Sequence, residues 1–556
     1  MKLRLLLIVL LSSFSFHAQE QIKKETLNFF GGFETNSQWY LNDRGLKVEQ
    51  PDVPLRANSY LFLNLKYNNW AAGIQGESYE NEALLNFNPR YNKTDVATYF
   101  LQFKNEMIDL TAGYFYEQFG SGLLYRSWED RALGINNALR GARVILKPTS
   151  YFTLKSIYGR QRSGFVVSEG EIYGVDSELL LSDLFDMKTS ELTFGLTYVG
   201  RDERIRTTEN PNYSSLTNGY AARVDFSHNG FYWSAEYNLK SRDAIVEVVG
   251  QIEDDFVKPG NALLMNIGYS KKGFGIDGSF RRLEHMSFFS ERIAKGNAFN
   301  DRILNFVPSL TKQHHYNLAN IYVYQAQPNV FLGDETLLKV GEIGGQLDVF
   351  YNFKKNTPLG GKFGTKVALN VSNWHALGGT FYLPKKDYDA DFFGFGKKYF
   401  SDYNLEITKK LSPKLQTVFT YINQYYNKKL VEETDGVVKT NILGGEAIYK
   451  LTDTKSIRIL AEHMWADYDR KNWASSTVEF NLNSKLSLYV LDLYNYGNDD
   501  PEMRSHYYNF GGAFRQKSTR IGFNYGRQRG GLVCVGGVCR FVPESSGVTL
   551  SLNTTF

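Results

Sequence analysis

The sequence predicts an all-β protein, a large antiparallel transmembrane β-barrel. Three observations predict it: repeated period-two runs of apolar residues, an alternation of short turns with long polar connections, and an amphipathic last segment that ends on Phe556. The composition agrees, because 40 Phe and 37 Tyr help to raise the aromatic share to 15%, which suits strands. The net charge of +4 gives no indication of a nucleic-acid partner.

The amino terminus predicts export. Residues 5–11 form a short apolar run that follows Lys2 and Arg4 and precedes a Ser-rich stretch ending at Ala18. The run has the length of a signal-peptide apolar region and falls well short of the ~20 residues of a membrane helix. We therefore expect residues 1–18 to be a cleaved signal peptide and residues 19–556 to form one barrel in a bacterial outer membrane.

The strand pattern is clearest between residues 220 and 240. Apolar residues alternate with polar ones over residues 220–227, and the alternation resumes over 231–240 after His228, Asn229 and Gly230, a type I′ turn signal. The same pattern recurs over residues 274–281, 477–482 and 520–525. A strand whose two faces meet different surroundings has this period. We expect the apolar face to meet lipid and the polar face to line a wetted lumen.

The connections alternate in length. Tight ones such as 271–273, 412–414 and 453–455 are interleaved with long polar ones, predicted at 43–56, 81–96, 243–259 and 376–401. Short periplasmic turns and long extracellular loops are typical of outer-membrane barrels. A hairpin of two ~11-residue strands with its connections takes about 40 to 45 residues, so the chain has room for roughly 20–26 strands. The alternation is lost between residues 287 and 342, which leaves the count as a range.

The last strand carries much of the prediction. Val548, Leu550, Leu552, Thr554 and Phe556 share one face, and polar residues occupy the other. A closing amphipathic strand that ends on Phe resembles the targeting signal of bacterial outer-membrane proteins, which the barrel-assembly machinery reads during insertion. In hydrocarbon every backbone amide needs a partner, so the sheet must close into a barrel.

The two cysteines predict a disulfide. Cys534 and Cys539 flank Val535-Gly536-Gly537-Val538, and a two-residue turn at the glycines would set them opposite each other. An oxidising envelope compartment permits the bond, and the hairpin, which joins the last two strands, is expected outside the cell. Half of a zinc site is the alternative, although no other Cys exists.

A charged stretch between residues 116 and 143 holds the candidate functional residues. Three acids and four arginines could form a network across the lumen or a constriction that sets the charge preference of a pore. The alternative is that paired charges rigidify the wall of a wide barrel. The lumen or constriction candidates are Glu117, Arg126, Glu129, Asp130, Arg131, Arg140 and Arg143.

Other features are less specific. Tyr-Gly-Arg-Gln-Arg occurs at 158–162 and again at 525–529, either as a basic rim feature suited to lipopolysaccharide phosphates or as a repeated strand ending. The acidic turn at 495–502 could hold calcium or could simply be solvated. His314-His315 is expected to be a loop end. With no catalytic motif and no metal or cofactor signature, we expect a protein that is not an enzyme.

Three stretches carry a resemblance to a known family: residues 116–143, the glycine-rich segments 341–346 and 360–365, and the Cys534–Pro543 turn with the closing strand. Together they resemble an uncharacterised family of Bacteroidota outer-membrane β-barrels over essentially the whole mature chain. The resemblance implies channel-type, porin-like barrels without a plug or a periplasmic energy-coupling box. It assigns no functional residues.

The leading hypothesis is a passive or gated diffusion channel. The alternative is a non-catalytic barrel subunit of a larger outer-membrane assembly, secretion or surface-display complex, whose long loops would dock other outer-membrane proteins or surface lipoproteins. An outer-membrane hydrolase ranks last. Expected partners are outer-membrane lipid and lipopolysaccharide, with no nucleic acid.

Overall fold

The computed structural model describes residues 27–203, 214–246, 252–292, 302–332, 337–382 and 387–556. The predicted signal peptide, residues 1–18, lies outside the described residues. Among the described residues, no helix is both long and apolar enough to span a bilayer.

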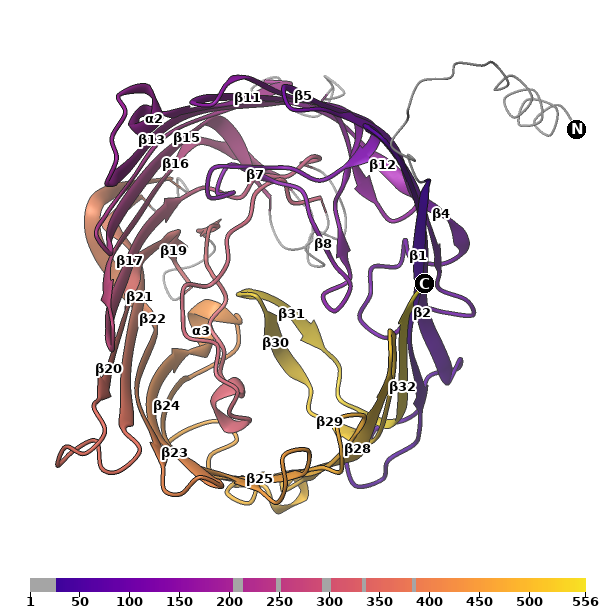
Figure 1. The fold of residues 1–556 in the computed structure, drawn as a ribbon, viewed down its shortest axis with the longest axis vertical. Helices are drawn as coiled ribbons and strands as arrows, with labels where there is room; N and C mark the ends of the chain where they lie inside the picture. Colours follow the sequence, from indigo (N-terminus) through magenta and orange to yellow (C-terminus); the bar gives the residue numbers. More distant parts are fainter. Residues whose placement is uncertain (1–26, 204–213, 247–251, 293–301, 333–336, 383–386) are drawn as a thin grey trace, which may run out of the picture.

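The wall is one closed sheet of 24 antiparallel strands, a number within the predicted range (Figure 1). Each strand pairs with its neighbours along the chain, and β1 pairs with β32 from Gly32↔Thr555 to Tyr40↔Gly547 to close the ring. Closure leaves no edge strand, so the backbone groups of the wall are paired within the sheet.

The first half of the wall consists of β1 (Asn28–Tyr40), β2 (Leu55–Tyr67), β3 (Trp70–Ser78), β4 (Thr94–Lys104), β5 (Ile108–Phe115), β10 (Leu139–Thr149), β11 (Phe152–Ser163), β12 (Val166–Leu180), β13 (Ser190–Asp202), β14 (Leu216–His228), β15 (Phe231–Val246) and β16 (Ile252–Lys271). The second half consists of β17 (Phe274–Glu284), β20 (Glu342–Phe353), β21 (Thr365–Tyr382), β22 (Asp387–Lys410), β23 (Leu415–Asn427), β24 (Val437–Lys450), β25 (Ser456–Ala466), β26 (Trp473–Asn481), β27 (Leu486–Tyr494), β28 (His506–Gln516), β29 (Thr519–Gln528) and β32 (Ser545–Thr555).

The side chains alternate across the wall as the sequence predicts. On β14, Tyr220 is 51% exposed on the outer face, whereas Arg223 is 6% exposed and bonds Asp176 and Glu178 inside. Leu196 and Ile267 are likewise about half exposed on the outer face of their strands. A strand with one apolar and one polar face produces this arrangement when the sheet closes around a polar interior.

The connections define two rims. At the short-turn rim lie the tight turns, including the predicted Asn229-Gly230 turn, whose φ values of 48° and 82° are those of a type I′ turn. Gly31 and Phe556 also meet there, through two backbone hydrogen bonds of 3.0 Å. A four-residue helix, α2 (Leu181–Leu184), forms one turn of this rim.

The long-loop rim differs from the prediction at two places. The predicted loops 243–259 and 376–401 are mostly strand, because β15 with β16 and β21 with β22 extend well beyond their neighbours. The β21–β22 hairpin packs on other parts of the barrel, since the Arg282 guanidinium of β17 donates to the carbonyl of Phe392 at 2.7 Å. Its Leu377 and Tyr388 are each 1% exposed, in a cluster with residues of the segment that joins β17 to β20. The other two predicted loops, 43–56 and 81–96, are long connections at this rim.

Candidate functional site: three inserts inside the barrel

Three inserts leave the wall at the long-loop rim and fold back into the lumen (Figure 1). The first insert, residues 116–138, joins β5 to β10 and contains the short strands β6 (Gln118–Phe119), β7 (Tyr125–Arg126), β8 (Glu129–Asp130) and β9 (Ile135–Asn136). The second joins β17 to β20, is described at residues 285–292, 302–332 and 337–341, and contains η2 (Leu318–Asn320), β18 (Val330–Phe331) and β19 (Lys339–Val340). The third, residues 529–544, is the hairpin β30 (Gly531–Val535) and β31 (Val538–Val542).

The first insert turns inward because its apolar side chains are buried there against the wall. Phe119 is 1% exposed and Tyr125 is fully buried, and both pack against inward-facing apolar residues of the wall, among them Ile157, Ile172 and Val199. An apolar inner face is unusual for a wetted barrel and marks where the wall is covered. The packing gives this sector of the lumen a core.

The second insert covers a larger sector in the same way. Its Tyr324 stacks on two wall residues, Trp374 and Phe400, with ring centroids 5.9 and 5.4 Å apart. Leu318 is fully buried nearby, in the cluster that also contains Trp473. The inner faces of β21–β26 therefore carry apolar residues, many of them aromatic, because the second insert packs on them.

The third insert contains the disulfide. Cys534 and Cys539 are paired in register on β30 and β31 and are bonded, with their Cα atoms 3.9 Å apart. The hairpin joins the last two wall strands at the long-loop rim, as predicted, but it points into the lumen instead of outward (Figure 1). The reason is packing: Leu532 is 3% and Cys539 2% exposed, and the insert meets the second insert there.

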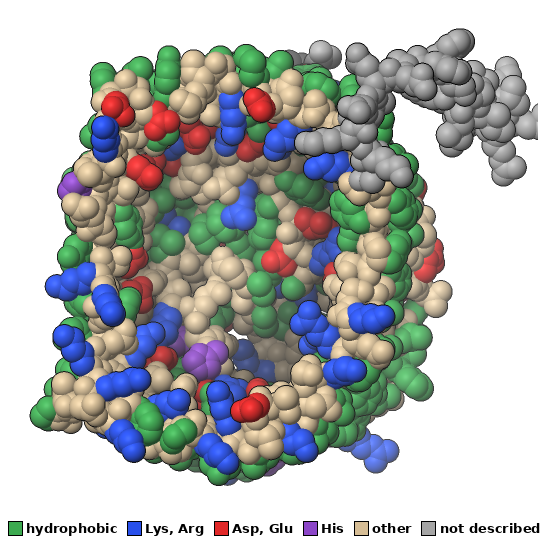
Figure 2. Space-filling view, in the orientation of Figure 1, with side chains coloured by type: hydrophobic (Ala, Val, Ile, Leu, Met, Phe, Trp, Pro, Cys, Tyr) green, Lys and Arg blue, Asp and Glu red, His purple; other side chains and the backbone are tan. Residues whose placement is uncertain are grey.

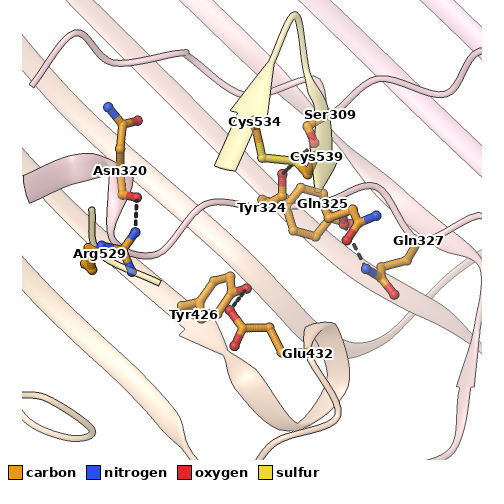
Figure 3. The surroundings of a disulfide bond; sticks show 10 residues. All are labelled: Ser309, Asn320, Tyr324, Gln325, Gln327, Tyr426, Glu432, Arg529, Cys534 and Cys539. Carbon is orange, nitrogen blue, oxygen red and sulfur yellow. Dashed lines mark hydrogen bonds between the residues drawn. A yellow bond between two sulfur atoms is a disulfide. The ribbon is translucent and has the colours of Figure 1, made fainter. Parts of the chain in front are cut away.

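The inserts bind one another through hydrogen bonds. The backbone N–H of Arg126 donates to the carbonyl of Leu304 (2.8 Å), and that of Phe306 donates to Gly122 (2.9 Å), which joins the first and second inserts. The N–H of Ser309 donates to Gly537 (2.8 Å), and Arg529 donates to the carbonyl of Asn320 (3.1 Å), which joins the second and third. Figure 3 shows the disulfide beside Tyr324 and Ser309 of the second insert. The three segments form one body, which we call the plug.

An ion pair of the wall anchors the plug. Arg281 on β17 and Glu342 on β20 are 2.5 Å apart and at most 1% exposed. Glu342 accepts from the hydroxyl of Tyr324 (2.6 Å) and the backbone N–H of Gln327 (2.8 Å), and Arg281 donates to the carbonyl of Pro308 (2.6 Å). Burial raises the pKa of Tyr324 well above its ordinary value, and the Glu342 carboxylate adds to the rise. Tyr324 therefore stays a neutral hydrogen-bond donor.

A second anchor lies where the second insert begins. Asp243 of the wall bonds Arg201 of the wall at 2.9 Å and Arg292 of the insert at 2.6 Å, and all three side chains are at least 95% buried. Two arginines on one carboxylate hold the insert and two strands together. Buried ion pairs of this kind cost several kcal/mol when one partner is removed.

The structure separates the predicted lumen residues into groups. Glu117 accepts from Arg143 and Lys155 at 3.4 Å each, while Arg143 also bonds Asp109 at 3.0 Å; these charges lie along the inner wall. Arg131 bonds Glu34 on β1 at 2.8 Å.

The remaining members of the stretch have separate positions. Glu129 bonds Arg131 at 3.2 Å, so it belongs with the contact to β1. Arg126 stacks on Phe306 at 3.9 Å and on Trp128 at 5.0 Å, and Asp130 accepts from the N–H of Leu133. These side chains lie on the first insert, inside the barrel.

Arg140 does not line the lumen. It pairs in register with Arg160 on β11 and Tyr114 on β5, and it is exposed, whereas Arg143, three residues along the same strand, faces inward. An odd spacing on a regular strand sets two residues on opposite faces. Arg140 thus belongs to the outer surface near the long-loop rim, a correction to its expected place.

The plug leaves space in the lumen. A cavity of about 320 Å³ lies where the three inserts meet, lined by residues such as Phe288, Asn305, Gln327, Cys539 and Arg540. A second of about 220 Å³ separates the second insert from the disulfide hairpin. Seen from the short-turn rim, the molecule is a deep hollow that narrows to a small gap (Figure 2).

Sequence reasoning missed the second insert as an element of the lumen. The only sequence feature that sets this segment apart is the absence of strand periodicity over residues 287–342, which are nevertheless rich in aromatic and amide side chains. The plug also departs from the plug-free barrels that the family resemblance implies. The four-residue helix α3 (Lys428–Val431) adds a further inward contact, in which Leu430 accepts from Lys339 at 2.9 Å.

The structure also locates the weaker candidates. Nδ2 of Asn495 donates to the carbonyls of Arg470 and Asn472, and Nε2 of His314 bonds Asp402 at 2.9 Å. Within the described ranges, no three His, Cys, Asp or Glu side chains are placed to hold a metal ion.

A closed antiparallel barrel with an apolar outer face, a charged inner face and long loops at one rim has the architecture of outer-membrane β-barrels. The chain belongs to DUF6029, a family of unknown function whose sequence profile matches residues 1–556.

The fold has distant likenesses among solved structures. The siderophore receptor PirA from Pseudomonas aeruginosa has a TM-score of 0.42 and 8% identity, covering 96% of this chain and 81% of the receptor. The P pilus usher (PapC) translocation pore has a TM-score of 0.41 and 9% identity, covering 96% and 99%. A BenF-like porin from Pseudomonas fluorescens has a TM-score of 0.35 and 8% identity, covering 96% of this chain and 99% of the porin. No curated protein matches the sequence.

Proposed function

We propose that this protein is an outer-membrane channel with a non-catalytic, gated lumen, in which the plug is the gate. The observation that carries the proposal is the plug itself, three inserts tethered at one rim and joined by hydrogen bonds such as Ser309 to Gly537. A barrel of 24 strands is wide enough for a channel or a plugged lumen. Solutes would pass when the inserts move apart.

Placement in the outer membrane rests on the outer face. Large apolar side chains such as Leu369 (43% exposed) and Val490 (56%) cover it, and a closed sheet satisfies its backbone without water. In this orientation the long-loop rim faces outside and the short-turn rim faces the periplasm. The ion pairs of the lumen would set the charge preference of the pore.

The test is single-channel conductance of the purified protein in a planar bilayer. In one variant a two-residue Asn-Gly turn replaces residues 529–544, since Gln528 and Ser545 already pair as the last residues of β29 and β32. The matched control shortens residues 495–505 in the same way between the paired residues Tyr494 and His506. Removing the third insert should give larger or longer openings, and the control should conduct like the wild type.

Two outcomes would contradict the proposal. If the variant lacking the third insert folds but conducts no more than the wild type, the plug is not the gate. If every form is silent, the barrel is not a channel, and the role of subunit in a larger assembly becomes the better hypothesis.

A further inference from the structure

The charge of the short-turn rim is divided unequally around the ring. Over β16–β29 the turns and the adjoining strand ends, residues 271–274, 351–366, 409–415, 450–456, 482–486 and 515–520, are strongly basic. Their basic residues are Lys271, Lys272, Lys354, Lys355, Lys362, Lys366, Lys409, Lys410, Lys414, Lys450, Lys455, Lys485, Arg515, Lys517 and Arg520, and Asp453 is the one acid in these ranges. We call this set the basic arc.

The rest of the rim is balanced. The turns of β2–β15, residues 66–70, 104–108, 146–152, 180–191 and 228–231, contain four Lys and four acids. These are Lys66, Lys104, Lys147, Lys188, Glu106, Asp183, Asp186 and Glu191. Figure 2 shows the same contrast, with Lys and Arg gathered along the rim below and to the left and with acids mixed among them at the top.

Carboxylates of the described residues do not neutralise the arc. None of its side chains forms an ion pair with a carboxylate of the described residues, whereas the barrel interior pairs most of its charges. Lys355, Lys414 and Lys455 are exposed at turn tips. Unpaired like charges repel one another, so the arc carries a positive potential that an anionic partner would relieve.

One turn of the arc also presents an apolar tip. Residues 354–364 form the longest connection of the arc and are held in shape by backbone bonds between Asn356 and Gly361 (2.7 Å) and between Gly361 and Thr357 (2.8 Å). Leu359, at the tip, is 64% exposed between Lys355 and Lys362. An ordered apolar tip among cations offers a protein partner both packing and charge contacts.

We propose that the basic arc is the docking surface for an acidic periplasmic protein, which it meets through a segment rich in Asp and Glu. The proposal rests on the proposed orientation, in which the short-turn rim faces the periplasm. Lipid headgroups surround a barrel on all sides, so a lipid-binding role would not confine the lysines to one half of the ring. Twelve neighbouring strands span about 60 Å of rim, the scale of a protein surface.

The experiment measures binding of a fluorescein-labelled peptide of 20 glutamates to the barrel in nanodiscs of phosphatidylcholine, a lipid without net charge. The arc variant combines Lys354→Gln, Lys355→Gln, Lys410→Gln and Lys414→Gln. The control variant removes the same number of charges through Lys66→Gln, Lys104→Gln, Lys147→Gln and Lys188→Gln. The arc variant should bind ~10-fold more weakly, and the control within ~2-fold of the wild type, with binding weakened by salt.

Equal losses in both variants, or none in either, would overturn the proposal. So would a lipid result: if the arc variant loses bound phosphatidylglycerol from mixed nanodiscs while its peptide binding stays at the control level, the arc is a lipid contact. Bilayer conductance should be the same in all three proteins, so failure of the channel hypothesis would be seen separately. Labelling of Lys355→Cys in intact cells, without permeabilising the outer membrane, would show that the orientation is wrong.

Discussion

Arg281 and Glu342 lie on neighbouring wall strands, 2.5 Å apart and buried, and the carboxylate of Glu342 also accepts a hydrogen bond from Tyr324 of the plug. One ion pair thus holds together two wall strands and the plug. Removing one partner should destabilise both the wall and the plug, because a carboxylate left unpaired in a buried site costs about 3–5 kcal/mol.

Arg281→Met should loosen the plug. With Glu342 unpaired, we expect a higher open probability in a planar bilayer and a lower midpoint of thermal unfolding. The double variant Arg281→Met with Glu342→Met removes both charges, so it should recover part of the lost thermal stability. Its open probability should stay raised, because Tyr324 and Gln327 lose their acceptor. If the single variant is as closed and as stable as the wild type, the ion pair does not hold the plug.

Arg143 and Arg140 lie on opposite faces of β10, so they offer a matched test of whether the inner face sets ion selectivity. Arg143 bonds Asp109 and Glu117 inside the barrel, whereas Arg140 is exposed on the outer face. Arg143→Ala should therefore change the cation-to-anion permeability ratio of the open channel, and Arg140→Ala should leave it unchanged. A shift with Arg140→Ala alone would mean that the side-chain alternation of β10 is reversed.

The disulfide should stabilise the third insert. In the chain-entropy account, closing a loop this short is worth about 2 kcal/mol. Cys534→Ser with Cys539→Ser should therefore raise the open probability, and reducing the wild type should produce the same change. A reducing agent should have no effect on the double variant; an effect there would mean that it acts elsewhere.

The burial of His285 predicts that the plug becomes less stable in acid. It begins the second insert, and burial, with Lys240 nearby, lowers the pKa of His285 to about 3, while its Nε2 bonds the carbonyl of Asp243. The folded plug disfavours the charged ring, whereas the unfolded chain does not. The free energy of unfolding is therefore unaffected by His285 above pH ~6.5 and decreases as the pH falls from there towards 3. At pH 5 the loss is about 2 kcal/mol.

The measurement is open probability between pH 7 and pH 4. The wild type should open as the pH falls, and His285→Gln should respond less because it has no proton to bind there. Identical pH profiles in the two proteins would contradict a role for His285.

The wall could be predicted from the sequence because alternation is a local property. Residues 220–240 specify a hairpin on their own, and Phe556 lies in a closing strand whose pattern is complete within nine residues. The strands at 376–401 do not show in the sequence because their alternation is interrupted by register shifts between Trp374 and Gly379, and because residues such as Tyr388 are buried by segments distant in sequence. The charge of Arg140 does not show which way it faces, because that depends on the register of β10.

The plug could not be predicted in the same way. Tyr324 and Trp374 stack although 50 residues separate them, and Ser309 bonds Gly537 across more than 200. Neither contact leaves a local pattern. The sequence did contain an indirect sign, since inward positions such as Ile157 and Trp374 are apolar where a wetted wall would carry polar residues. An apolar residue at an inward position indicates that something covers it.

The tethering of all three inserts at one rim gives the gate a direction. Each insert begins and ends on wall strands at the long-loop rim, so it can swing out through that opening without breaking the ring, but no hinge connects it to the opposite end. A solute pushing from the long-loop side drives the inserts deeper against their packing, whereas one arriving from the short-turn side lifts them towards their hinges. A channel built in this way would rectify, passing solutes more readily in one direction than in the other.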